Sequence, residues 1–221
     1  MNSKIDVLNE SALQFFGTMT ASISHEINNV LAIINENAGL LEDFTLMADK
    51  GLPIDPARFK TLAGKIMIQI RRADTIIKKM NEFAHSVDVP VKRIDLIDIL
   101  ELLIVLSKRF ASMREVTLEL KRPANPVIIT TNDFLLENLL WLCLDVAMDA
   151  TGKDKTVVMS VDKAGNNAVI RFSGIEGIKD VPGRMSNITE KDGLLGSIKG
   201  KLDIDQEAGN ILLTLPSDIN N

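Results

Sequence analysis

Apolar residues in the first quarter of the chain recur at the spacing of an amphipathic helix. They follow steps of about three, four and seven residues, which is the stripe of a helix in a bundle or coiled coil: Phe16, Ile23, Ile27, Val30, Ile34 and Leu41. The pattern predicts a helix from about residue 11 to 48. Residues 49–56 are rich in helix breakers and predict a loop. Asp55 before Pro56 predicts the N-cap of a second helix.

The second helix is predicted to end near Ser86, ahead of Pro90. One face of it is apolar, through Leu62, Ile66, Ile70, Ala73, Ile77, Met80 and Ala84. Neither helix can bury its stripe alone, whereas two hairpins would form a closed four-helix core. We therefore predict a homodimer through residues 11–86. The alternative is that the rest of the chain covers the stripe.

The second half of the chain predicts an α+β sandwich, with helices on one face of one sheet. Strongly apolar stretches predict helices over 95–111 and 133–150. Short alternating or β-branched runs predict strands over 116–120, 127–129, 156–162, 168–173, 202–204 and 210–215.

Composition narrows the possible partners and compartment. The net charge of the 221 residues is −5 and no basic stripe is present, which argues against nucleic acid as a partner. No run of about 18 apolar residues is present, so we expect no membrane span. With no signal-peptide core at the start, the expected location is the cytoplasm. The single cysteine, Cys143, lies in an apolar run and is expected to be a buried structural thiol. We expect no metal site in a chain with two histidines.

The strongest candidate for chemistry is the segment Ser24-His25-Glu26-Ile27-Asn28-Asn29. His25 is two residues from both Ile23 and Ile27, so it lies about 200° around the helix from each and should face solvent. An exposed imidazole beside a carboxylate suits nucleophilic or proton-transfer chemistry near neutral pH. A lone helical histidine is usually a surface residue without a role, so the hypothesis depends on the whole segment. His85, at the end of the second helix, is expected to be structural or incidental.

This segment resembles the phosphoacceptor box of bacterial sensor histidine kinases. Its His-Glu-x-x-Asn pattern is matched by His25, Glu26 and Asn29, while Val30 replaces the usual proline. The resemblance implies that residues 1–90 form a dimerisation and phosphoacceptor hairpin, which pairs into a dimeric four-helix bundle. It implies that residues 91–221 form a domain like the kinase ATP-binding domain.

The same comparison predicts that this second domain is degenerate. Val146 falls where the family has its magnesium-binding asparagine, and valine cannot ligate magnesium. Ser173 and Ile175 replace the aspartate and first glycine of the adenine-binding loop. The lid region, residues 193–200, keeps glycines without the usual pattern, after a short linker over residues 179–192. We therefore expect no nucleotide cofactor and no metal of the chain's own.

The chain is thus similar to the histidine phosphotransferases of bacterial two-component phosphorelays. The resemblance implies that His25 carries a phosphoryl group between aspartates of response-regulator receiver domains, with magnesium supplied by the receiver. Glu26 would orient His25 or accept its proton, and Asn29 would hold a water or a phosphoryl oxygen. Ser24 and Asn28 would contact the partner. Three alternatives stay open: a divergent soluble sensor histidine kinase, a response-regulator phosphatase, and a non-catalytic scaffold that binds a true kinase.

Overall fold

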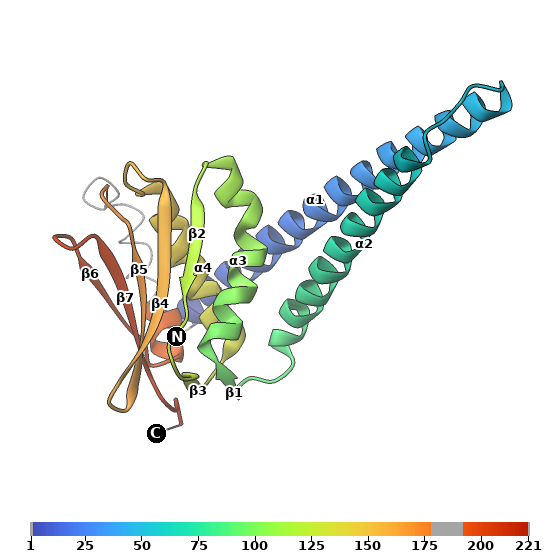
Figure 1. Cartoon of the computed structure of the whole chain (residues 1–221). Coiled ribbons are helices and arrows are strands. Elements are labelled where there is room, and N and C mark those ends of the chain that lie inside the picture. Colours follow the sequence, from blue (N-terminus) through green and yellow to red (C-terminus); the bar gives the residue numbers. More distant parts are fainter. Residues whose placement is uncertain (1, 178–191, 221) are drawn as a thin grey trace. The chain divides into compact units, whose positions relative to one another are not determined.

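The computed structural model describes residues 2–177 and 192–220. The chain divides into two compact units, one of residues 20–81 and one of residues 1–19 with 82–221. The fold class is the predicted one, α+β with a long N-terminal helical hairpin (Figure 1). The domain boundary predicted between residues 90 and 91 stays a prediction.

The hairpin consists of α1 (Asn2–Asp49) and α2 (Pro56–Ala84), joined by a short loop. The start of α2 is confirmed in detail, because the Asp55 carboxylate accepts a hydrogen bond from the Ala57 amide at 2.9 Å. The predicted start of α1 near residue 11 is wrong, since the helix already begins at Asn2. Residues 2–10 contain neither glycine nor proline, so nothing in their backbone chemistry stops the helix from extending.

Within residues 20–81, the two helices bury a narrower seam than the sequence predicted. Val30 on α1 and Leu62 and Ile76 on α2 are buried. Ile70 and Ile77, which were predicted for the same seam, are each 43% exposed within the single chain. The reason is that α2 carries apolar residues on more than one face. The spacing of apolar residues along the sequence cannot decide which of these faces meets α1.

The remaining strands form two sheets instead of the single predicted one. Strands β1 (Lys92–Asp95) and β3 (Ile128–Thr131) pair antiparallel, and β1 was not predicted. The larger sheet has the order β2-β4-β5-β7-β6. Its members are β2 (Thr117–Lys121), β4 (Thr156–Ala164), β5 (Asn167–Ser173), β7 (Asn210–Pro216) and β6 (Lys201–Asp205). Only the β2–β4 pair of this sheet is parallel.

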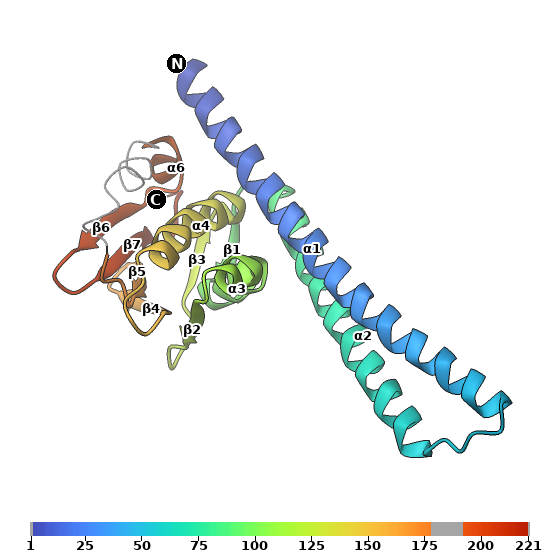
Figure 2. The same ribbon diagram turned by 90° about the horizontal axis from the view of Figure 1, so that it is seen from above.

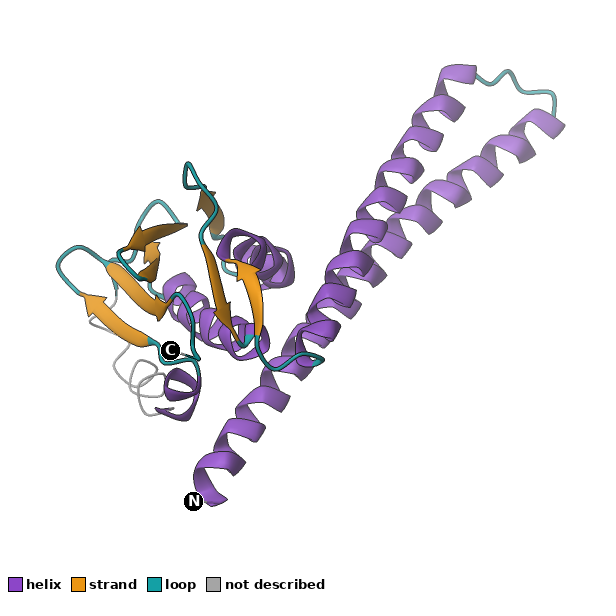
Figure 3. Cartoon of the chain, turned by 90° about the horizontal axis from the view of Figure 1, so that it is seen from below, coloured by secondary structure: helices purple, strands orange, loops and turns teal. Residues whose placement is uncertain are grey.

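Helices α3 (Leu96–Met113) and α4 (Asp133–Asp149) cover one face of the larger sheet (Figure 2). The alternation of β4 explains the packing: Val157, Met159 and Val161 are buried, and the residues between them are only partly covered. Cys143 on α4 is fully buried, as predicted, and burial raises the pKa of its thiol to about 12. The short helix α6 (Asp192–Ser197) also packs against α4 (Figure 3).

The start of α1 and the end of α2 contact the sheet-bearing part of the chain through aromatic rings. The Phe15 and Phe83 rings meet edge to face at 5.4 Å, and Phe134 at the start of α4 lies 5.7 Å from Phe15. A 3₁₀ turn, η1 (His85–Val87), then ends the helical region. These rings belong to the same compact unit as α3 and α4.

Candidate functional site

His25 lies on the exposed surface of α1, as its position relative to Ile23 and Ile27 predicted. Among the described residues, its imidazole has no hydrogen-bond or ion-pair partner. Asn28 and Asn29 are also exposed. They follow His25 by three and four residues, so all three side chains share one face of the helix. The site therefore presents an imidazole with two amides one turn away.

Glu26 is held by a partner that the sequence did not reveal. Its carboxylate lies 2.6 Å from the Arg72 guanidinium of α2, and its side chain is only 14% exposed. Consecutive residues of a helix point about 100° apart, so this ion pair directs Glu26 toward α2. Nothing in the spacing of residues 26 and 72 signals the pair, because it depends on how the two helices meet.

His85 has a local partner and differs from His25 in this respect. Its Nδ1 lies 2.7 Å from the carboxylate of Asp88, and both side chains are exposed. The pair lies within one turn of the chain just after α2. This contact fits the structural role that the sequence predicted for His85.

On α4, the position predicted to replace a magnesium-binding asparagine faces the core. Val146 is 3% exposed. Two carboxylates on the same helix, those of Asp145 and Asp149, are already paired. They lie 2.7 Å and 2.6 Å from the Arg114 guanidinium. The carboxylates therefore tie α4 to the end of α3.

The segment around the end of β5, which the resemblance predicted to replace the adenine-binding loop, makes hydrogen bonds to backbone carbonyl groups. The Ser173 hydroxyl donates to the Val158 carbonyl at 3.1 Å. The amides of Glu176 and Gly177 both donate to the Ala150 carbonyl at the end of α4. Gly174 has φ +90°, where a side chain would also collide with the Thr156 carbonyl oxygen. Most of the predicted linker, residues 178–191, lies outside the described residues.

Comparison with known proteins finds similar structures but no similar sequence. No family model matches the chain, and no curated protein matches it. Histidine kinase AdeS of Acinetobacter baumannii is 13% identical, with a TM-score of 0.46 over 89% of this chain and 98% of its own.

Two further solved structures are similar. One is histidine kinase ThkA in complex with response regulator protein TrrA, which is 16% identical, with a TM-score of 0.48 over 95% of this chain and 64% of its own. The other is described as a bacterial phosphotransferase and is 14% identical, with a TM-score of 0.49 over 91% of this chain and 95% of its own.

None of the described helices combines the length and the apolar character that crossing a membrane requires.

Proposed function

We propose that this chain is a histidine phosphotransferase of a two-component phosphorelay. The observation that carries the proposal is His25, exposed and without a partner among the described residues, inside a Ser-His-Glu-Ile-Asn-Asn segment of a helical hairpin. A second observation favours phosphoryl transfer over kinase activity. The two positions that should bind Mg-ATP are a buried valine, Val146, and a serine that donates to backbone, Ser173.

The proposed reaction moves a phosphoryl group between two side chains. A ring nitrogen of His25 attacks the phosphorus of an aspartyl phosphate on a receiver domain, in line with the bond to the aspartate oxygen. A P–N bond forms as that P–O bond breaks, and the aspartate leaves as a carboxylate. The receiver's magnesium ion neutralises the phosphoryl oxygens. The imidazole loses its N–H proton, and the reverse reaction passes the group to another receiver.

The neighbouring residues have supporting roles in this proposal. Glu26 orients His25 or accepts its proton in this proposal, which requires its carboxylate to leave the Arg72 guanidinium that lies 2.6 Å away. Asn29 donates an amide hydrogen bond to a phosphoryl oxygen or holds a water. The exposed side chains of Ser24 and Asn28 lie where a docked receiver would contact the helix.

The donor of the phosphoryl group distinguishes the proposal from a divergent kinase. The full-length chain is incubated either with radiolabelled Mg-ATP or with a panel of radiolabelled phosphorylated receiver domains, and acid-labile label on the chain is measured. We expect label from at least one receiver and none from ATP. Label from ATP on His25 would overturn our interpretation of Val146 and Ser173. Stable binding of a kinase without any label would support the scaffold alternative.

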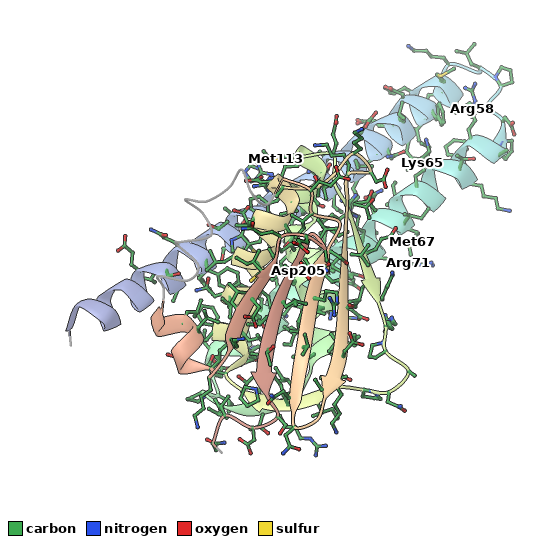
Figure 4. The ribbon with its side chains drawn as sticks, turned by 90° about the vertical axis from the view of Figure 1, so that its left-hand side faces the viewer. Arg58, Lys65, Met67, Arg71, Met113 and Asp205 are labelled. Atoms are coloured by element: carbon green, nitrogen blue, oxygen red, sulfur yellow. The ribbon has the colours of Figure 1, made fainter. Side chains whose placement is uncertain are left out.

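We also propose that the hairpin forms a homodimer. On α2, Met67, Ile70 and Ile77 are each at least 43% exposed and follow steps of three and seven, so they form one stripe along the helix. Figure 4 shows Met67 projecting from α2 near Arg71. An exposed apolar stripe of this kind in a soluble chain indicates an interface, and a second copy supplies an identical stripe for a four-helix core.

The dimer is tested by placing a charge in this stripe. Ile77→Glu is expected to convert a dimer to a monomer, because a buried unpaired carboxylate costs several kcal/mol. Light scattering after size exclusion gives the mass. Thr75→Glu, which adds the same charge at an exposed polar position of the same helix, should leave the dimer intact. A wild-type protein that is monomeric at micromolar concentration would contradict the proposal.

A further inference from the structure

A cavity of about 250 Å³ opens within the sheet-bearing unit, away from His25 in sequence and unrelated to the phosphoryl chemistry. Its walls come from β1, from the first turns of α3 and α4, and from Glu82 at the end of α2. The charged side chains on these walls are mostly acidic. The acids are Glu82, Asp95, Asp98, Asp133 and Glu137, and the bases are Lys92 and Arg93.

Two of these carboxyl groups are buried and incompletely paired. Asp133 and Glu137 lie one turn apart on α4, and each is 2% exposed. One Asp133 oxygen lies 2.6 Å from the Lys92 ammonium. Within the described part of the chain, the second Asp133 oxygen and Oε2 of Glu137 have no hydrogen-bond partner. A buried acceptor left without a donor is unfavourable. Asp133 and Glu137 both line the cavity, so their carboxyl groups are acceptors available to a ligand.

The charges around Glu137 favour a cationic ligand. Glu137 has the negative charge of Asp133 on the same helix, and the hydroxyl of Ser86 in η1 is a hydrogen-bond donor to its carboxyl group. Two further acids line the same cavity, Glu82 from α2 and Asp98 from α3. The charged residues that β1 contributes to the cavity are Asp95, Lys92 and Arg93. Burial, and then Asp133, raise the pKa of Glu137 to about 8. Near pH 7 the carboxyl of the empty cavity is therefore mostly protonated, and a bound cation would favour its ionised form.

The arrangement of carboxyl oxygens in the cavity favours an organic cation over a metal ion. No group of three His, Cys, Asp or Glu side chains that could hold a metal ion occurs among the described residues. Two acceptors one helical turn apart match a head group that carries several N–H donors in a compact space. We propose that this cavity binds a small organic cation, an alkylammonium or guanidinium compound, between the carboxyl groups of Asp133 and Glu137.

The proposed binding step releases a proton. The ligand's N–H groups donate to Oδ1 of Asp133 and Oε2 of Glu137, and the Glu137 carboxyl loses its proton to solvent as the cation enters. Binding is therefore tighter at higher pH. Since ionised Glu137 rises from about one tenth of the molecules near pH 7 to nearly all near pH 9, affinity should rise about tenfold over that range.

Calorimetric titration of the full-length chain with methylguanidinium and with 1,4-diaminobutane tests the proposal. The expected result for at least one probe is one site per chain, an affinity that rises about tenfold from near pH 7 to near pH 9, and release of close to one proton near pH 7. The released proton is measured from the heats in two buffers of different ionisation enthalpy.

Variants separate the cavity from general charge effects. Glu137→Gln keeps the shape of the protonated side chain, and it should weaken binding at least about tenfold near pH 9 and remove the proton release. Glu119→Gln makes the same change at an exposed position on β2 and should bind like wild type. Absence of binding to the folded wild-type protein at millimolar probe, or binding that Glu137→Gln leaves unchanged, would overturn the proposal. Neither outcome affects the proposed role of His25.

Discussion

Replacing His25 by glutamine is expected to lower phosphoryl transfer from a phosphorylated receiver by at least about a thousandfold, because the substitution removes the nucleophile on which the proposed reaction depends. Glutamine has no ring nitrogen that can form a P–N bond. His25 is exposed, and an exposed helical substitution changes stability by no more than about 0.5 kcal/mol. The loss should therefore appear in acid-labile label on the chain, with an unchanged thermal melting temperature.

The other histidine of the chain provides a matched control. His85→Gln makes the same substitution at an exposed side chain that contacts Asp88, and transfer should persist in it. Transfer that survives His25→Gln would contradict the proposed function. Release of free phosphate that survives the same substitution would instead support the phosphatase alternative, in which Glu26 and Asn29 position a water against the receiver's aspartyl phosphate.

The stability of the folded protein is expected to fall as the pH rises from about 5 to about 8, through the titration of Glu137. Burial raises the pKa of this carboxyl from 4.5 to about 8. Between those values the folded protein holds a proton that the unfolded chain has released. The free energy of unfolding therefore decreases by up to about 1.4 kcal/mol per pH unit in this range. The stabilisation from the protonated Glu137 carboxyl is fully present below pH 4.5. It is lost above pH 8, the approximate pKa of Glu137 in the folded protein.

Urea unfolding near pH 6 and near pH 8 measures this effect. Other groups also titrate, so the informative quantity is the difference between wild type and Glu137→Gln. Glutamine cannot ionise, and the wild type should lose about 2 kcal/mol more than this variant between the two pH values. Glu119→Gln, with its exposed side chain, should behave like wild type. Equal pH dependence in wild type and Glu137→Gln would show that Glu137 is ionised in the fold.

The features that the sequence predicted well depend on residues close together along the chain. A helical repeat, a capping aspartate before a proline and an alternating strand all act over a few residues. This explains why the hairpin, the Asp55 cap and six of the seven strands among the described residues could be recognised. The outward direction of His25 belongs to the same class, because two residues on either side fix its angle on the helix.

The features that the sequence missed depend on contacts between distant segments. Strand β1 is four residues long and stays extended by pairing with β3, more than thirty residues later. The choice between Ile76 and Ile77 as the buried residue of α2 depends on where α1 lies, and so does the pairing of Glu26 with Arg72, 46 residues apart.

The sequence by itself determined the order of the helices and the chemical identity of the candidate site, because local backbone preferences and side-chain chemistry are properties of short segments. Only the tertiary structure decided which face of α2 is buried, which partner holds Glu26, and that Asp133 and Glu137 share a cavity with β1. Burial and long-range pairing arise when segments meet, and the same glutamate on an exposed turn would have an ordinary pKa and no site.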